Sequence, residues 1–256
     1  MSVTGRIAAL AAPVPRPESF TRCLFIGPHP DDIEVGAGAT AAKLRAMGKQ
    51  VSFLICTDGR FGLENAPAGT TPEALAELRQ KESLEAARAL GVQDVRFLSF
   101  SDGGLYDKQA LFRAMAQAVG RLQPEILFAP DPFVSSECHA DHLNVGEAAR
   151  RLALFAPFGG IMEAYGAQRA PVRAIAFYMS ARPNRYVGTT GFLDAQRRAL
   201  LCHKSQFPEG SAAFRDVELY LKLRAVEFGL RSLHRTAEGF RVLGVTQMHC
   251  LPEAGN

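Results

Sequence analysis

The chain of 256 residues has no tryptophan, few cysteines and no long hydrophobic run. Because a membrane-spanning helix needs roughly 20 consecutive apolar residues, no segment of this sequence is a transmembrane helix candidate. The cysteines are five in number and scattered, and no two of them form a C-x-x-C motif. This usage is typical of a cytosolic protein that buries cysteines as small hydrophobic residues, so we expect a cytoplasmic location.

No charge of one sign dominates either. The 29 lysines and arginines nearly balance the 26 aspartates and glutamates, which leaves a net charge of +3, and the two signs are interspersed. A nucleic-acid or anionic-membrane partner normally requires a basic patch, so we expect neither partner. The apolar fraction of 47% and the charged fraction of 21% exclude an intrinsically disordered chain.

Apolar runs with β-forming residues alternate with segments of helical periodicity through the first two thirds of the chain. This alternation predicts an α/β fold, with a Rossmann-like, mostly parallel sheet and helices on both faces. Ligands then bind at the carboxyl ends of the strands. The expected strands are 23–27, 51–56, 95–100 and 125–129, and the expected helices are 35–47, 72–90, 108–122 and a segment from about 144.

The pattern becomes less regular after about residue 155. One more strand is expected at 172–179 and helices are expected at 192–201 and 217–230. At the other end, three prolines interrupt the chain before the core of a signal peptide develops. We therefore expect an N-terminal extension over residues 1–20 and a single domain over residues 21–256, with a boundary near residue 156 as the alternative.

Two clusters of histidines and acids follow two of the expected strands. The first is Gly27-Pro28-His29-Pro30-Asp31-Asp32, and the second is Glu137-Cys138-His139-Ala140-Asp141-His142. Both loops leave the same edge of a parallel sheet, so their side chains should meet. An imidazole and a carboxylate three residues apart, joined by an imidazole from the other loop, form the two-His, one-carboxylate set of a catalytic zinc site, which leaves a position for water.

The remaining residues of the clusters are those that amide hydrolysis needs. Asp31 is adjacent to the expected metal and can act as the general base, while His139 can stabilise the oxyanion or donate a proton. Asp141 can fix the tautomer of His139. Adjacent Asp31 and Asp32 would repel each other if unpaired, and a divalent cation removes this repulsion.

These motifs resemble the PIG-L/LmbE-like zinc-dependent N-acetylglucosamine deacetylases. The segment 29–40 looks like the signature loop of that family with the glycine-rich helix start after it, and 139–142 resembles its downstream His-x-Asp-His motif. Weaker similarities extend over most of the chain, and the similarity is closest to the bacterial bacillithiol-pathway type. The weaker similarities lie at 78–82, 86–91, 101–105, 205–207 and 237–240.

The resemblance implies a zinc-dependent N-deacetylase whose substrate is a small N-acyl amino sugar or a related amide. It implies further that Zn²⁺ is held by His29, Asp32 and His142. The resemblance also implies that Asp31 is the general base, that His139 and Asp141 form a charge-stabilising pair, and that the protein is a homo-oligomer. Two further residues, Arg79 and Asp102, become candidates for binding substrate hydroxyls.

Three alternatives stay open from the sequence. The first is an amidase acting on a non-sugar N-acyl substrate, which needs the same metal site and general base. A dinucleotide-binding protein is possible because Gly36-Ala37-Gly38-Ala39-Thr40-Ala41 fits G-x-G-x-x-A and Asp58 lies near the spacing of a ribose-binding acid. Iron or cobalt would also fit the expected ligands, with zinc as the default. Departures from the family pattern at Pro28, Ala140 and Gly188 leave the accepted amine open.

Overall fold

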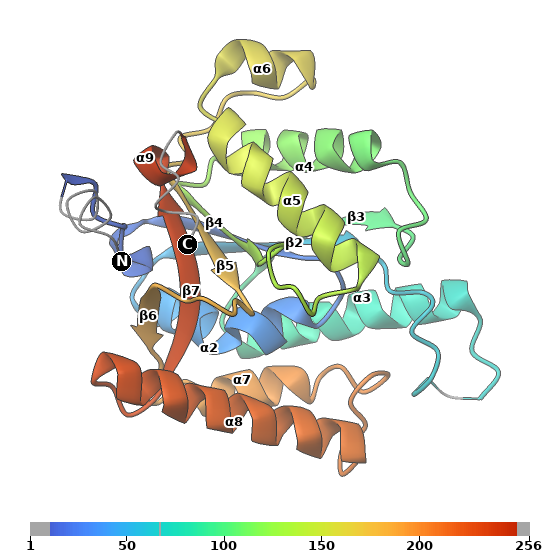
Figure 1. The fold of residues 1–256 in the computed structure, drawn as a ribbon. Helices are drawn as coiled ribbons and strands as arrows, with labels where there is room; N and C mark the ends of the chain where they lie inside the picture. Colours follow the sequence, from blue (N-terminus) through green and yellow to red (C-terminus); the bar gives the residue numbers. More distant parts are fainter. Residues whose placement is uncertain (1–10, 67, 250–256) are drawn as a thin grey trace.

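A seven-stranded sheet forms the centre of the molecule in a computed structural model, which describes residues 11–66 and 68–249 (Figure 1). The strand order is β3-β2-β1-β4-β5-β7-β6. The strands are β1 (Arg22–Gly27), β2 (Gln50–Thr57), β3 (Asp94–Phe100), β4 (Ile126–Pro130), β5 (Ala174–Tyr178), β6 (Arg185–Gly188) and β7 (Ala237–Gly244).

The strands from β1 to β5 are parallel, and β7 pairs antiparallel with both β5 and β6. From β1 the chain moves outward to β2 and β3 and then returns to place β4 on the other side of β1. The sheet therefore has a topological switch point between β1 and β4. In a sheet of this kind the crevice outside the carboxyl ends at the switch point is where ligands bind.

Helices cover both faces of this sheet, as Figure 1 shows. The helices α2 and α3, with α7, pack on one hydrophobic core, whereas α4 and α5 pack on the other. The helices are α2 (Asp32–Ala46), α3 (Pro72–Ala89), α4 (Lys108–Leu122), α5 (Ala140–Phe155), α6 (Gly159–Ala164), α7 (Leu193–Leu200), α8 (Ala212–Ser232) and α9 (Val245–Met248), and a 3₁₀ turn, η1, spans Pro17–Ser19.

The central strands are apolar on both faces because helices cover both sides of the sheet. All of β4 is buried, and so is β1 after its first residue. The rings of Phe25 and Phe128 stack across the two strands, with centroids 4.0 Å apart. This packing fixes the strand ends that carry the two His-Asp motifs.

The predicted parallel α/β fold with helices on both faces is confirmed, and the two differences that matter lie at helix starts. α2 begins at Asp32 and α5 begins at Ala140, both a few residues before the starts expected from apolar periodicity. The apolar period is hard to detect in these first turns because it is interrupted by Asp32 and Glu34 in α2 and by Asp141 and His142 in α5. Asp141 and His142 therefore lie on the first turn of α5, not in a loop.

The C-terminal part contains elements that the sequence pattern did not predict. The antiparallel pair β6 and β7 closes one edge of the sheet, and α6 forms where Gly159 and Gly160 suggested a break. β6 has four residues and α6 has six, lengths too short for a clear period.

Among helices of the described ranges 11–66 and 68–249, none is long and apolar enough to cross a membrane.

Candidate metal centre

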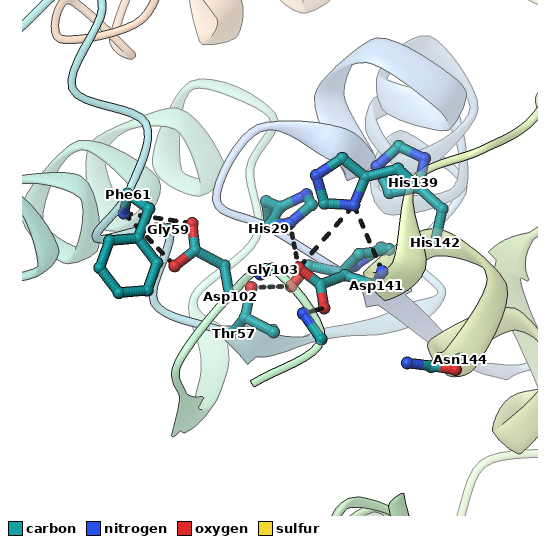
Figure 2. A network of polar contacts seen from close by, with 12 residues as sticks. His29, Thr57, Gly59, Phe61, Asp102, Gly103, His139, Asp141, His142 and Asn144 are labelled. Carbon is teal, nitrogen blue, oxygen red and sulfur yellow. Dashed lines mark hydrogen bonds and ion pairs between the residues drawn. The ribbon is translucent and has the colours of Figure 1, made fainter. Parts of the chain in front are cut away.

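The two His-Asp motifs meet at the switch point of the sheet. The first motif links β1 to α2, and the second ends the loop between β4 and α5. Figure 2 shows the rings of His29, His139 and His142 gathered on one side of Asp141. One ring nitrogen from each of these three histidines lies within 4.8 Å of the others. Residues more than 100 positions apart in the chain thus form one cluster.

Asp32 joins two of these histidines through its two carboxylate oxygens. One oxygen lies 3.1 Å from His29 Nδ1 and the other lies 3.3 Å from His142 Nε2. The backbone N–H of His29 also donates to the first oxygen at 2.8 Å, which fixes the carboxylate between the rings. Asp32 therefore contacts both of the other expected ligands, His29 and His142.

The opposite nitrogen of each of these two rings faces a second carboxylate. His29 Nε2 lies 2.9 Å from Asp141, and His142 Nδ1 lies 2.9 Å from Glu137. An N–H directed at such a carboxylate leaves the lone pair of a neutral imidazole on the other nitrogen. Both lone pairs then point at Asp32, which is the arrangement that a cation between the three residues requires.

The protonation energetics show how strongly this cluster attracts positive charge. Burial alone lowers the pKa of His29, but its hydrogen bonds to Asp141 and Asp32 outweigh that effect and raise the pKa to about 10. His142 behaves in the same way, and Asp32 raises its pKa to about 9. The two histidines in turn hold the pKa of Asp32 well below its usual range, against the effect of burial. Protons therefore balance the carboxylates in the absence of a metal ion.

His139 has a different environment from the other two histidines. Its side chain is 47% exposed, and its Nδ1 accepts the backbone N–H of Asp141 at 3.3 Å, so that it caps α5. Burial and the neighbouring charges of His29 and His142 lower its pKa. A neutral ring whose Nδ1 accepts a hydrogen bond carries its proton on Nε2. His139 therefore offers an N–H donor beside the cluster.

Asp141 contacts His29 more closely than the His139 with which the motif associates it. Its carboxylate lies 3.8 Å from His139 Nδ1, against 2.9 Å from His29. The same carboxylate accepts the backbone N–H groups of Gly103 at 2.7 Å and Gly104 at 2.8 Å. These bonds and the one to His29 lower the pKa of Asp141 to about 2, against the effect of burial. The charged Asp141 thus links the 101–105 turn to the cluster.

Asp31 lies next to the cluster in an unusual backbone conformation, with a φ of 129°. Such a positive φ costs energy in a residue other than glycine, and it persists only where neighbouring contacts impose it. Arg79 supplies those contacts, because its guanidinium donates to the Asp31 carboxylate at 2.9 Å and to the Pro30 carbonyl at 2.7 Å. Burial raises the pKa of Asp31, and although Arg79 opposes this, adjacent Asp32 adds to it.

A family model described as PIG-L: GlcNAc-PI de-N-acetylase matches residues 24–153, which include both motifs. The chain belongs to the PIG-L family. This finding confirms the assignment that the two motifs suggested.

Two relatives and one solved structure show how far the similarity to the PIG-L family extends. The chain is 31% identical to a diacetylchitobiose deacetylase of Thermococcus kodakarensis over 91% of its own length and 87% of the relative. It is 31% identical to a 1D-myo-inositol 2-acetamido-2-deoxy-alpha-D-glucopyranoside deacetylase of Kineococcus radiotolerans over 65% of its own length, which corresponds to 53% of that longer relative. A solved N,N'-diacetylchitobiose deacetylase from Pyrococcus horikoshii, complexed with its inhibitor, superposes with a TM-score of 0.87 at 27% identity, covering 98% of this chain and 97% of that one.

Arg79 and Asp102, the two residues expected to bind substrate, are both buried and bonded to other parts of the protein. Arg79 is buried, and besides its bonds to Pro30 and Asp31 it donates to the Gly59 carbonyl at 3.0 Å. Asp102 is also buried, and its carboxylate accepts the backbone N–H of Phe61 (Figure 2). In this structure both side chains hold backbone of the neighbouring loops.

Glu137 is the residue of this PIG-L site that sequence reasoning missed. The sequence places it in the second cluster without a role, but in the structure it accepts a hydrogen bond from His142 Nδ1 and another from the backbone N–H of His139 at 2.7 Å. Its pKa is lowered by these bonds, although burial opposes them. The only signal in the sequence was a carboxylate two positions before one histidine and five before another.

The glycines that suggested dinucleotide binding have a packing explanation. A Cβ atom on Gly36 would lie 2.2 Å from the ring of Tyr178, so only glycine fits where α2 crosses β5. Asp58, the candidate ribose-binding acid, has its carboxylate paired with Arg60 at 2.6 Å. The close helix–strand packing accounts for Gly36 without a phosphate ligand.

Zinc fits the residues of this PIG-L site on chemical grounds. Two imidazoles and one carboxylate supply the mixed nitrogen and oxygen donors that zinc prefers in catalytic sites. Each imidazole has a carboxylate on its far nitrogen, as ligating histidines almost always have. The donor set therefore fits a divalent metal ion.

Proposed function

We propose that the protein is a metal-dependent N-deacetylase that hydrolyses the acetyl amide of an N-acetylated amino sugar, with zinc as the metal. The family assignment and the full-length similarity to a diacetylchitobiose deacetylase support the reaction and the substrate class. One observation of the structure carries the mechanism: His29 and His142 each direct one ring nitrogen at Asp32, immediately beside Asp31.

In this proposal His29, Asp32 and His142 hold the metal ion. Zinc held by these residues would supply polarisation of the amide carbonyl and would lower the pKa of water toward about 7, so that a nucleophile would be available at neutral pH. Asp141 and Glu137 hold the two imidazoles in the required tautomers through hydrogen bonds of 2.9 Å each. Asp141 and Glu137 are therefore positioning residues, because each acts through the proposed ligand that it contacts, His29 or His142.

Asp31 is the proposed general base. Burial and the adjacent Asp32 raise its pKa, which makes its carboxylate a better proton acceptor than an exposed aspartate. Arg79 keeps that carboxylate in place through a hydrogen bond of 2.9 Å, so we assign Arg79 a positioning role. This role differs from the substrate contact that the family resemblance implied.

His139 is the proposed oxyanion donor. A neutral ring with its proton on Nε2 can donate to the oxygen that gains negative charge as the amide is attacked. The lowered pKa of His139 keeps the ring neutral near pH 7. The departing amine needs a proton, and the protonated Asp31 can return the one that it accepted from water.

An assay of amine release tests the proposal. The purified protein is incubated with N-acetylglucosamine, N,N'-diacetylchitobiose and, as a non-sugar amide, an N-acetyl amino acid. We expect free amine from an amino sugar, loss of activity with a chelator and recovery with zinc. Amine release that survives full removal of metal would contradict the metal-dependent mechanism, and exclusive cleavage of the amino acid amide would contradict the substrate class.

A further inference from the structure

Phe61 exposes an aromatic ring at the rim of the metal centre. The residue is 46% exposed and lies in the loop that follows β2. This loop leaves the carboxyl edge of the sheet beside the first motif, because the backbone N–H and the hydroxyl of Thr57 both donate to the Pro28 carbonyl at 2.8 Å. Pro28 directly precedes His29, so Phe61 follows a strand end that contacts the loop of the proposed ligands.

Arg79 fixes this loop two residues before Phe61. One end of its guanidinium, Nη1, donates to the Gly59 carbonyl at 3.0 Å, and the other end, Nη2, donates to the Asp31 carboxylate at 2.9 Å. Gly59 has a φ of 66°, and a Cβ atom there would overlap the Arg79 guanidinium, so glycine allows this close approach. The residue that holds the proposed general base thus also holds the loop of Phe61.

Asp102 fixes the backbone of Phe61 itself. Its carboxylate accepts the N–H of Phe61 at 3.2 Å, and the next residue, Gly103, donates its N–H to Asp141 at 2.7 Å. Asp141 in turn contacts the proposed ligand His29. Figure 2 shows Asp102 between Phe61 and the histidine cluster. The backbone of Phe61 is therefore tied to the metal centre on a second side.

The fixed backbone gives the exposed ring of Phe61 a different meaning from that of an isolated surface residue. Gln206 donates to the Gly62 carbonyl at 2.9 Å, so the loop is held at residues 59, 61 and 62. Single exposed apolar residues are ordinary on a protein surface. A ring presented on a fixed backbone beside a site loses little conformational freedom on binding, which is what a preorganised ligand contact requires.

The surroundings of Phe61 favour an uncharged ligand. The neighbouring Arg60 and Asp58 pair with each other, with Nε and Nη2 of the guanidinium 3.0 and 2.6 Å from one carboxylate oxygen. The turn that contains Asp102 exposes a second large apolar residue, Leu105, which is 68% exposed. A phosphate or carboxylate at this position would lose hydration and would compete with Asp58 for the guanidinium. An uncharged group with an apolar face avoids both costs.

A pyranose ring is an uncharged group of this kind. One face of the ring consists largely of C–H groups, which stack on the negatively polarised face of an aromatic side chain while the hydroxyls stay in water. A substrate larger than one sugar extends over the rim when its acetyl amide lies at the metal centre. The ring next to the reacting amino sugar is the part that lies over the rim.

We propose that Phe61 is a specificity-determining residue that stacks on a second, uncharged pyranose linked to the amino sugar that is deacetylated. This inference rests on the proposed function and narrows its substrate class to a disaccharide or longer oligosaccharide. The stack is made equally in the bound substrate and in the transition state. It therefore lowers KM and leaves kcat nearly unchanged.

Steady-state kinetics with N-acetylglucosamine and N,N'-diacetylchitobiose test the proposal. For the wild type we expect a KM for the disaccharide about tenfold below that for the monosaccharide, since one aromatic stack contributes roughly this factor. Phe61→Ala should raise KM for the disaccharide about tenfold and leave its kcat within about twofold of the wild type. Both constants for the monosaccharide should stay within about twofold, because it does not reach the rim.

Two further variants separate stacking from a structural effect. Phe61→Trp keeps an aromatic face and should retain the low KM for the disaccharide. Phe158→Ala is the matched control, since it removes a ring of similar exposure, 52%, at the start of α6. Figure 1 shows α6 at the end of α5 that is remote from the metal centre, so this variant should behave like the wild type.

N-acetylglucosamine 1-phosphate tests the charge of the second unit, because it carries a dianion in place of a second ring. Its KM should be no lower than that of N-acetylglucosamine. A KM below that of the disaccharide would overturn the uncharged substrate class. Equal KM values for the two uncharged sugars in the wild type, or an equal rise of both in Phe61→Ala, would overturn the stacking role.

Binding measurements keep this proposal separate from the proposed function. Calorimetric titration of zinc-loaded Asp31→Asn protein with the same two uncharged sugars measures binding without turnover. Absence of amine release from either sugar by the wild type contradicts the proposed function alone. Disaccharide binding that is no tighter than monosaccharide binding, or that Phe61→Ala does not weaken in this background, contradicts the role of Phe61.

Discussion

The parallel strands β1 to β5 with their loops form the first half of this comparison, and the chain from β6 onward forms the second, C-terminal half. The two halves differ in where their charged and apolar residues lie. In the first half the charged residues at the strand ends are buried and paired, as at Asp32 and Asp141. In the second half apolar residues are exposed along α8. The difference arises because parallel strands bring the loops at their carboxyl ends together at one switch point, whereas the antiparallel strands and outer helices lie at the edge and surface of the molecule.

The two halves are nonetheless connected behind the metal centre. α2 is kinked at Ala37, and the N–H groups of Ala39 and Thr40 that this kink frees are accepted by the carboxylate of Glu238 on β7. Gln196 of α7 bridges the Glu34 carbonyl and the same carboxylate. The C-terminal half thus supports the helix that carries Asp32. Substitutions in the first half should therefore affect chemistry, and substitutions at the contact between the halves should affect stability.

The largest expected effect is on metal binding through His142. Replacement by alanine, His142→Ala, removes a proposed ligand and leaves Glu137 and Asp32 without their shared partner. We expect zinc affinity, measured by competition with a chelator, to fall by more than about 100-fold. His234→Ala, at an exposed histidine far along the chain, is the control. If His142→Ala binds one zinc ion per chain with the affinity of the wild type, His142 is not a ligand.

The second largest effect is expected on turnover through Asp31, with metal binding unchanged. Asp31→Asn keeps the shape of the proposed general base but removes its basicity, so turnover should fall by about 10²–10⁴. Zinc content should stay at the wild-type value, because Asp31 is not among the proposed ligands. Steady-state kinetics and metal analysis on one preparation measure both quantities. A variant with normal turnover would exclude Asp31 as the base.

A smaller effect is expected at Glu137. Glu137→Gln weakens the acceptor for His142 Nδ1, and loss of such a hydrogen bond typically lowers metal affinity about 10–100-fold. Chelator competition measures the change, and Glu137→Asp should recover part of it. Glu147→Gln, an exposed glutamate of α5 that pairs with Arg150, is the matched control. Equal zinc affinities for Glu137→Gln and the control would assign Glu137 no role in positioning the ligand.

The smallest effect is a pH dependence of stability at the contact between the halves. Burial raises the pKa of Glu238 from 4.5 to about 7, although the bonds from Thr40, Ala39 and Gln196 oppose this. Between these pH values the folded chain holds a proton that the unfolded chain releases, so this residue makes stability fall as pH rises through that window.

Glu238→Gln cannot ionise and should flatten this decline. Urea unfolding of both proteins at several pH values between 4.5 and 7 measures the difference. If the two free energies of unfolding change in parallel with pH, Glu238 does not titrate in this window. Zinc affinity of the variant should stay close to the wild-type value, since the residue contacts the backbone of α2 and not the proposed ligands.

Much of the fold was predictable because its signals are local. Apolar runs predicted the strands β1 to β5, and helical periodicity predicted α3 and α4 to within a residue or two. The short strand β6 and the short helix α6 have too few residues for a period. The starts of α2 and α5 were missed because acids and a histidine interrupt the apolar period in their first turns.

The sequence by itself determined the chemistry available, since two motifs with histidines and aspartates at strand ends predict a metal site and a family. Only the tertiary structure decided which nitrogen of each imidazole is free, because that depends on carboxylates elsewhere in the chain, such as Asp141 beside His29. The hydrogen bond from Arg79 to Asp31 was not expected from the sequence for the same reason. Hydrogen-bond partners are set by distances in space, and spacing along a chain does not specify them.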